Sequence, residues 1–70
     1  MHTGKRIQHI RASVAHINQY ELAKKTGYLN QSQISKIEKG SRKVTDVDLK
    51  NIAKALGVPV ETLLTGEDVS

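Results

Sequence analysis

Cysteine is absent from the 70-residue sequence, which excludes disulfide bonds and metal sites built from thiolates. This composition is consistent with a reducing environment such as the cytoplasm. No apolar run approaches the roughly 20 residues that a membrane-spanning helix needs. The N-terminal residues 1–6 lead into an amphipathic segment and lack the apolar core of a signal peptide. We therefore expect a cytoplasmic protein without a membrane-spanning segment.

Aromatic residues are scarce as well, since Tyr20 and Tyr28 are the only two and Phe and Trp are absent. Modules that bind single-stranded nucleic acid stack unpaired bases on aromatic rings, so this class is disfavoured. Charge, in contrast, is unbalanced, because 11 Lys and Arg residues against 7 Asp and Glu residues leave a formal net charge of +4. This excess favours a polyanionic partner, a nucleic acid or an anionic membrane. If the partner is a nucleic acid, a duplex is favoured.

The sequence also lacks the motifs of common enzyme classes. It has no cysteine nucleophile, and GxSxG, HExxH and the phosphate-binding P-loop do not occur. His2, His9 and His16 recur every seven residues. His9 and His16 would lie two helical turns apart, about 10 Å, which is too far for one zinc ion to bridge. We therefore expect neither an enzyme nor a protein that binds a metal or another cofactor.

Apolar residues recur at helical spacing over most of the chain, and no segment alternates as a β-strand would. We predict an all-α fold of five helices in one domain, residues 1–70, with a core over about residues 4–64 and a flexible tail at residues 65–70. The first helix should run from about Thr3 or Gly4 to residue 15 or 16, and Thr3 can serve as its N-cap. Its apolar stripe consists of Ile7, Ile10, Val14 and Ile17.

The segment from residue 19 to residue 40 is typical of two short helices joined by a turn. Asn18 and Glu21 have the spacing of a capping box at the start of the second helix. Gly27 should end that helix in a left-handed conformation. The third helix should run from residue 30 or 31 to about residue 38, with two isoleucines facing inward, Ile34 and Ile37.

Two further helices complete the prediction. The fourth should begin at Thr45, with Asp48 at the capping-box position, and end at Gly57. The fifth should start near Pro59, because proline suits the first turn of a helix. A candidate dimer surface lies on the fifth helix and the end of the fourth, although its apolar residues could simply close the core: Val58, Val60, Leu63 and Leu64.

This order of residues resembles the lambda-repressor-like, or Xre-type, helix-turn-helix family. The resemblance covers nearly the whole chain, from about residue 4 to residue 64. It rests on an ordered set of matches: Gln19, Leu22, Ala23, Gly27, Ile34, Ser35, Ile37, Glu38, Gly40, Leu49, Ile52, Ala53, Leu56 and Gly57. It implies a DNA-binding transcriptional regulator, a repressor, that places its third helix in the major groove of double-stranded DNA.

Two departures from the family pattern concern the lengths of connections. The turn from Gly27 to Asn30 is one residue longer than usual, and the first helix reaches Gln19 with one extra residue. Both insertions fall near loops, where additional residues are tolerated best. The longer turn affects the tilt of the third helix and therefore its base register. We expect Leu29 to fill the core and Tyr28 to be exposed, as a candidate neighbour of a phosphate.

The resemblance assigns base recognition to the outward face of the third helix. The family's base-reading positions fall on Gln31, Ser32 and Lys36, with Ser35 and Gln33 close by. Gln can bond adenine through two hydrogen bonds, Lys can donate to guanine, and Ser suits several bases. The alternative is an ordinary solvated helix face.

Phosphate contacts are implied at two places. One is the start of the second helix, where Asn18 and Gln19 lie beside free backbone N–H groups; the alternative there is simple capping by Asn18. The other is the segment after the third helix, which could otherwise be a solvated run of charge: Lys39, Ser41, Arg42 and Lys43. The resemblance further implies an ion pair between Arg11 and Glu38, which could otherwise be two separate surface charges.

A single module of this kind contacts few base pairs, so a homodimer on a palindromic operator is expected, with no membrane partner. The alternative function is a protein-interaction module or an antitoxin-type component that uses the same fold. Basic residues beside the third helix favour DNA, whereas an apolar outer face would have favoured a protein partner.

Overall fold

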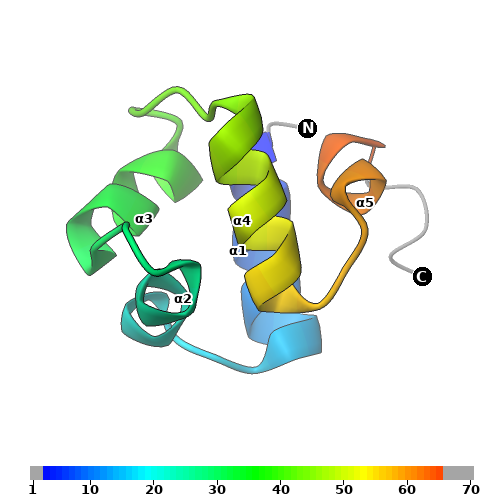
Figure 1. Cartoon of the computed structure of the whole chain (residues 1–70), viewed down its shortest axis with the longest axis horizontal. Helices are drawn as coiled ribbons and strands as arrows, with labels where there is room; N and C mark the ends of the chain where they lie inside the picture. The colour runs from blue at the N-terminus through cyan, green and yellow to red at the C-terminus, as the bar shows by residue number, and fades with distance from the viewer. Residues whose placement is uncertain (1–2, 66–70) are drawn as a thin grey trace.

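The structure, a computed structural model, describes residues 3–65, which form five α-helices and one π-helix (Figure 1). The helices are α1 (Thr3–Ile10), η1 (Arg11–Ala15), α2 (Gln19–Thr26), α3 (Gln31–Lys39), α4 (Asp46–Leu56) and α5 (Val60–Thr65). Residues 3–65 include no strand, and the prediction of an all-α fold is confirmed. In the same range, no helix has the length and apolar character needed to cross a membrane.

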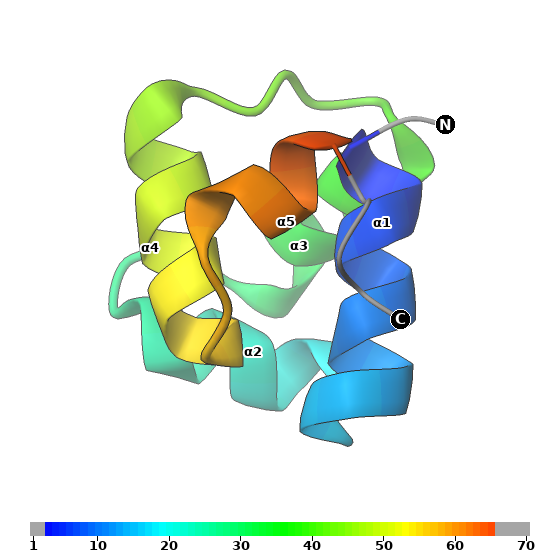
Figure 2. The same cartoon turned by 90° about the vertical axis from the view of Figure 1, so that its right-hand side faces the viewer.

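The helices enclose one core. In Figure 1, α4 lies in front of α1, with α2 and α3 on one side of this pair and α5 on the other. Turned by 90°, the molecule shows α5 lying between α4 and α1 (Figure 2). Residues from five helices and one turn meet in the core: Ile7, Ile10, Leu22, Ala23, Leu29, Ile34, Ile37, Leu49, Ile52, Ala53, Leu56 and Leu63.

The first helical segment has the predicted length, but its second half is a π-helix that ends at Ala15, with His16 as its C-cap. There, two successive backbone N–H groups, of His16 and Ile17, donate to the carbonyl of Arg11. A π-turn holds one residue more than an α-turn, which is room for the one extra residue that the family resemblance predicts before Gln19.

The π-helix overturns one detail of the sequence prediction. Val14 was expected in the apolar stripe, but its side chain is 48% exposed. The wider turn after Ile10 shifts the helical phase, so that Ile17 reaches the core and Val14 does not. At the other end, α1 begins at Thr3, one of the two predicted starts, so Thr3 is a helical residue and not the N-cap.

Local capping signals decide where the helices begin and end. The predicted capping boxes of Asn18 with Glu21 and of Thr45 with Asp48 are present. A third box, which the sequence analysis did not identify, joins Asn30 and Gln33 at the start of α3. Three glycines just past helix C-termini adopt the left-handed conformation: Gly27, Gly40 and Gly57.

The longer turn between α2 and α3 is anchored at both of its middle residues. Leu29 is buried in the core, as expected, and its N–H donates to the hydroxyl of Thr26 over 3.2 Å. Tyr28 is exposed, as expected, but its hydroxyl donates to the carboxylate of Asp48 in α4. Tyr28 thus ties this turn to α4.

The candidate dimer surface is smaller than the sequence indicated. Leu63 is fully buried, so for this residue the alternative interpretation, that it closes the core, is the correct one. Leu64, the next residue, is 53% exposed. Val58 and Val60 are half-buried and pack against the core. The six-residue helix α5 buries Thr62 and Leu63 on its inward side, so Leu64 is left facing outward.

Candidate nucleic-acid interface

The outward face of α3 carries the residues that the sequence assigned to base recognition. Ile34 and Ile37 are buried and hold the helix against the core. Gln31, Ser32 and Lys36 are consequently exposed. An open hollow of about 420 Å³ joins this face to the start of α2, lined by Gln19, Gln31, Ser32, Ser35, Lys36 and Lys39. Side chains from two helices therefore form one polar surface.

Gln33 takes part in the N-terminal cap of α3, a role that the sequence did not indicate. Its side-chain oxygen accepts from the backbone N–H of Asn30 over 2.9 Å, and its own N–H donates to the Asn30 side chain over 2.8 Å. It is half-buried and does not line the hollow. Gln33 fixes the start of α3, and the side chain's amide group is partly committed to that cap.

At the start of α2, Asn18 and Gln19 are both held in place. Asn18 caps the helix, since its side-chain oxygen accepts from the N–H of Glu21 over 2.8 Å. The side-chain amide of Gln19 donates to Glu38 over 2.9 Å. This bond orients Gln19 at the rim of the hollow, next to the free N–H groups of the first turn of α2.

Arg11 and Glu38 form the ion pair that the family resemblance implied. Arg11 Nε lies 2.7 Å from Glu38 Oε2, and Arg11 Nη2 donates to Oε1 over 3.2 Å. A third donor, Arg11 Nη1, reaches the carbonyl of Ile17 over 3.0 Å. The two side chains are 13% and 3% exposed. The pair joins η1 to α3 and, through Gln19, to α2.

Of the residues after α3 that were predicted to bind phosphate, only some are exposed. Ser41 and Lys43 are exposed, as is Lys39 at the end of α3. Arg42 is half-buried, and its Nη2 lies 3.9 Å from Oδ2 of the buried Asp48. Arg42 therefore has a partner inside the protein.

Asp48 is the residue whose importance the sequence analysis missed. It was identified only as a helix cap, but its carboxylate also accepts from Tyr28 and faces Arg42. Burial raises the pKa of this carboxyl, but the bonds from Tyr28 and Thr45 and the Arg42 charge outweigh burial and leave the pKa below 3.8. The pKa of Tyr28 is raised above 10.0 by desolvation and by the bond to Asp48. Asp48 thus carries its charge at neutral pH.

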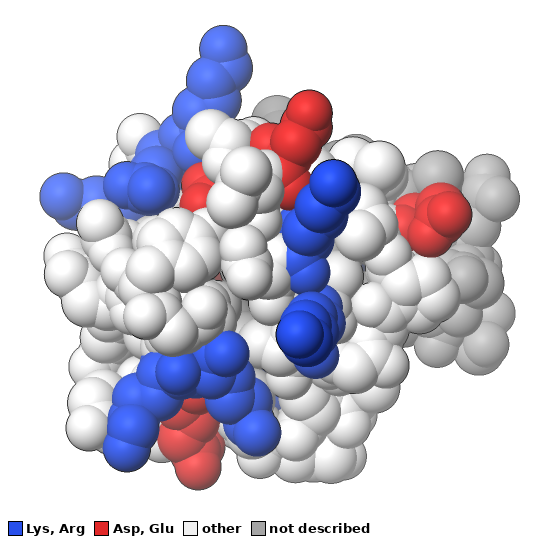
Figure 3. Space-filling view, viewed as in Figure 1, with Lys and Arg blue, Asp and Glu red and all other residues white. Residues whose placement is uncertain are grey.

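Positive charge is spread over several elements of the face on which α4 lies in front. Figure 3 shows Lys and Arg side chains over the segment between α3 and α4, over α4, and over α2. The lysines of α2 are Lys24 and Lys25, and those of α4 are Lys50 and Lys54. Lys24 lies over the ring of Tyr20, with 5.4 Å from its Nζ to the ring centroid. Within residues 3–65, no cluster of side chains suits a metal ion.

Comparison with known proteins decides the family. The helix-turn-helix family matches residues 15–63. The control protein C.BamHI of Bacillus amyloliquefaciens is 38% identical over 61 residues, which are 87% of this chain and 74% of that protein. The chain belongs to the helix-turn-helix family.

Two solved structures of similar proteins share the fold. The restriction-modification controller protein C.AhdI from Aeromonas hydrophila has 30% identity and a TM-score of 0.81, covering 87% of this chain and 86% of that chain. The DNA-binding domain of the P22 C2 repressor has 30% identity and a TM-score of 0.87, covering 100% and 88%. The lambda-repressor-like fold that the sequence predicted is confirmed.

In this helix-turn-helix protein, α2 and α3 are the two helices of the motif. The π-helix precedes α2, and Tyr28 lies in the turn between α2 and α3. Each of these two segments is held by a contact to another helix, through Arg11 in one case and Asp48 in the other.

The Arg11–Glu38 pair should contribute strongly to stability. In Arg11→Ala, Glu38 remains buried without its cation, and we expect a loss of about 3–5 kcal/mol in the free energy of unfolding, measured by urea denaturation. Adding Glu38→Gln should recover part of this loss, since no buried charge then remains. Lys25→Ala, at an exposed position, is the control. An unchanged stability of Arg11→Ala would contradict this role of the pair.

The charge of Asp48 predicts a pH-dependent effect. Asp48→Asn should lower the free energy of unfolding at pH 7 by about 1–3 kcal/mol, because a charged acceptor is lost. The native pKa lies below the unfolded value, so this contribution is present above about pH 4 and is lost as the pH falls through the native pKa. Melting curves from pH 7 to pH 2 should therefore converge for the two proteins. Asp46→Asn, exposed in the same helical turn, is the control, and a pH-independent difference would refute the charge argument.

Proposed function

We propose that this DNA-binding transcriptional regulator acts as a sequence-specific repressor by placing α3 in the major groove of duplex DNA. The observation that carries the proposal is the polar hollow shared by α3 and the start of α2. A major groove about 12 Å wide admits one helix, and the residues that line the hollow can hydrogen-bond to base edges and to phosphates. We further propose that residues 1–70 act as one domain in the cytoplasm, without an enzymatic activity.

Base recognition is proposed for the exposed polar residues of α3. Gln31, in the first turn, has an amide that suits adenine, and Ser32 and Ser35 can donate or accept. Lys36 lies one turn further along and can donate to guanine. Gln33 is a weaker candidate, because it caps the helix. Exposed large apolar residues occur elsewhere in residues 3–65 and not on α3, which disfavours a protein partner on this face.

Phosphate binding is proposed for both flanks of α3. On one flank, the N-terminus of α2 offers backbone N–H groups, the positive end of the helix dipole and the oriented amide of Gln19, with Asn18 beside it. On the other flank, the exposed donors are Lys39, Ser41 and Lys43. Arg42 can contribute its charge to the same flank while Asp48 holds it in place. These contacts supply affinity that depends on salt and carries no sequence preference.

A homodimer on a palindromic operator is proposed because one α3 reaches few base pairs. Half-sites would lie about one helical turn of DNA apart. The exposed Leu64, with the half-buried Val58 and Val60, offers an apolar surface on and beside α5. A twofold axis there would place the same residues of both copies against each other.

DNA binding can be tested by fluorescence anisotropy with short duplexes over a salt series, after selection of an operator from a random pool. The logarithm of the binding constant should fall linearly with the logarithm of salt. Lys43→Ala should make the slope shallower by about 0.9, since one phosphate contact is lost. Lys43 is preferable to Arg42 for this test, because Arg42 also faces Asp48.

The same assay tests base recognition. Gln31→Ala should relax the preference at one base pair by about 1–3 kcal/mol and leave the salt slope unchanged. Lys54→Ala on α4 is the control for both variants. Absence of binding by the wild type even at low salt would refute the proposal and favour a protein partner.

Dimer formation can be tested by sedimentation at micromolar concentration. The wild type should sediment as a dimer, and Leu64→Glu should sediment as a monomer, because a charge then enters the apolar surface. Val47→Glu is the matched control, since Val47 is also exposed but lies on α4. A wild type that is entirely monomeric would count against the dimer.

A further inference from the structure

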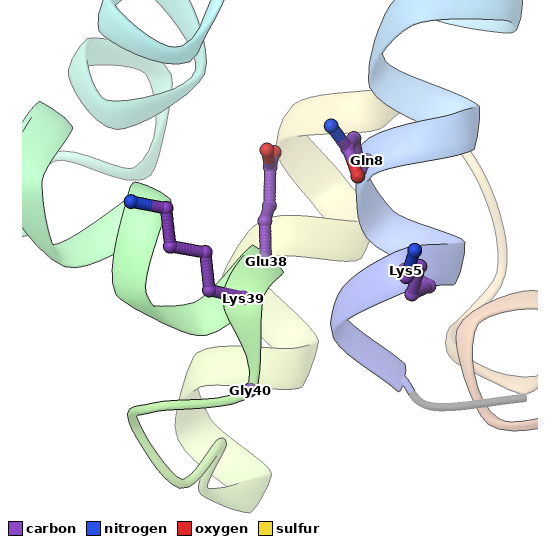
Figure 4. A pocket seen from close by; sticks show the side chains of 5 residues that line it. All are labelled: Lys5, Gln8, Glu38, Lys39 and Gly40. Atoms are coloured by element: carbon purple, nitrogen blue, oxygen red, sulfur yellow. The ribbon is translucent and has the colours of Figure 1, made fainter.

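A second groove lies beside the α3 face, between the start of α1 and the end of α3 (Figure 4). Its volume is about 450 Å³, and its lining residues are Lys5, Gln8, Glu38, Lys39 and Gly40. In Figure 4, Lys5 and Gln8 come from α1 on one side, and Glu38 and Lys39 come from α3 on the other. None of the roles discussed so far involves Lys5 or Gln8.

The groove exists because the two helices approach closely at Gly4. A Cβ atom at this position would lie 2.1 Å from the carbonyl oxygen of Ile37 and 3.0 Å from that of Glu38, so only glycine fits. The backbone of α1 therefore rests directly on the last turn of α3. Lys5 and Gln8 are three residues apart and share one face of α1, which this contact brings beside Lys39.

The charge of the groove is positive. Its one carboxylate, Glu38, is already bonded to Arg11 and to Gln19. Lys5 and Lys39 are exposed, and neither forms an ion pair within residues 3–65. The exposed amide of Gln8 adds a neutral donor on the same side of the groove as Lys5. The Lys5 ammonium and the Gln8 amide suit an anion that approaches from solvent, and Lys39 adds positive charge nearby.

Lys39 connects this groove to the hollow of the proposed base-reading surface, because it lines both. In Figure 4 the ammonium group of Lys39 points away from α1. The surface is therefore continuous from the start of α2, across α3, to the start of α1. A duplex lying on α3 would run on toward Lys5.

We propose that the groove binds a phosphate of the DNA backbone outside the bases that α3 reads, with Lys5 and Gln8 as its ligands. The inference rests on the proposed function, and it adds α1 to the DNA interface. The groove is open and its cations are exposed, so a free anion would be held weakly. A phosphate presented by a duplex already bound to α3 is held by the rest of the interface.

The experiment measures the salt dependence of binding on operator duplexes of decreasing length. On a long duplex, Lys5→Ala should make the slope shallower by about 0.9, which corresponds to about eightfold weaker binding at 0.1 M salt. On a duplex trimmed to the half-site bases, the variant and the wild type should bind equally, because the flanking phosphate is missing. Gln8→Glu should also weaken binding on the long duplex only.

Lys54→Ala is the matched control, because it removes a lysine from α4 in the described fold without altering this groove. Melting curves of all variants establish that they are folded. If the wild type binds DNA and Lys5→Ala shows the same affinity and salt slope as Lys54→Ala on every duplex, the groove binds no phosphate, but the proposed function stands. If Lys5→Ala also weakens binding to the trimmed duplex, Lys5 does not act through a phosphate outside the half-site, and this proposal is overturned. Failure of the wild type to bind DNA overturns both proposals.

Discussion

The Glu38 carboxylate lies in the protein interior, and Arg11 and Gln19 supply the donors that make its burial tolerable. An uncompensated buried charge is far more costly than a missing surface contact, so these three side chains must occupy one arrangement. That arrangement sets η1, the start of α2 and the end of α3 relative to one another. It also orients Gln19 at the edge of the polar hollow on α3. Stability and the proposed DNA contacts therefore depend on the same charge.

The two connections that the family resemblance predicts to be longer are both held by contacts to other helices. Before α2, the chain forms a π-turn in which two backbone N–H groups donate to the carbonyl of Arg11, while the Arg11 side chain reaches Glu38. Between α2 and α3, Leu29 lies in the core and the Tyr28 hydroxyl donates to Asp48. The turn before α3 is therefore held by α4 as well as by the core.

Much of the fold could be predicted from the sequence. The capping boxes at Asn18 and Thr45 and the end of α2 at Gly27 were all located correctly, since these signals act over three or four residues. The details that could not be predicted involve helical phase and distant partners. Val14 follows the apolar spacing but lies outside, because the π-turn rotates it away from the core. Asp48 is recognisable as a cap, but its bond to Tyr28 spans 20 residues.

The sequence by itself determined the all-α class, the helix ends, the polar outer face of α3 and the excess of positive charge. These are set by composition and by neighbours within one helical turn. The tertiary structure alone decided that Leu63 is buried while Leu64 is exposed, and that Arg42 faces Asp48. It also decided that Lys5 lies across a groove from Lys39. Arg42 precedes α4 whereas Asp48 lies on it, and Lys5 and Lys39 lie on different helices, so these arrangements depend on how the helices pack and not on local sequence signals.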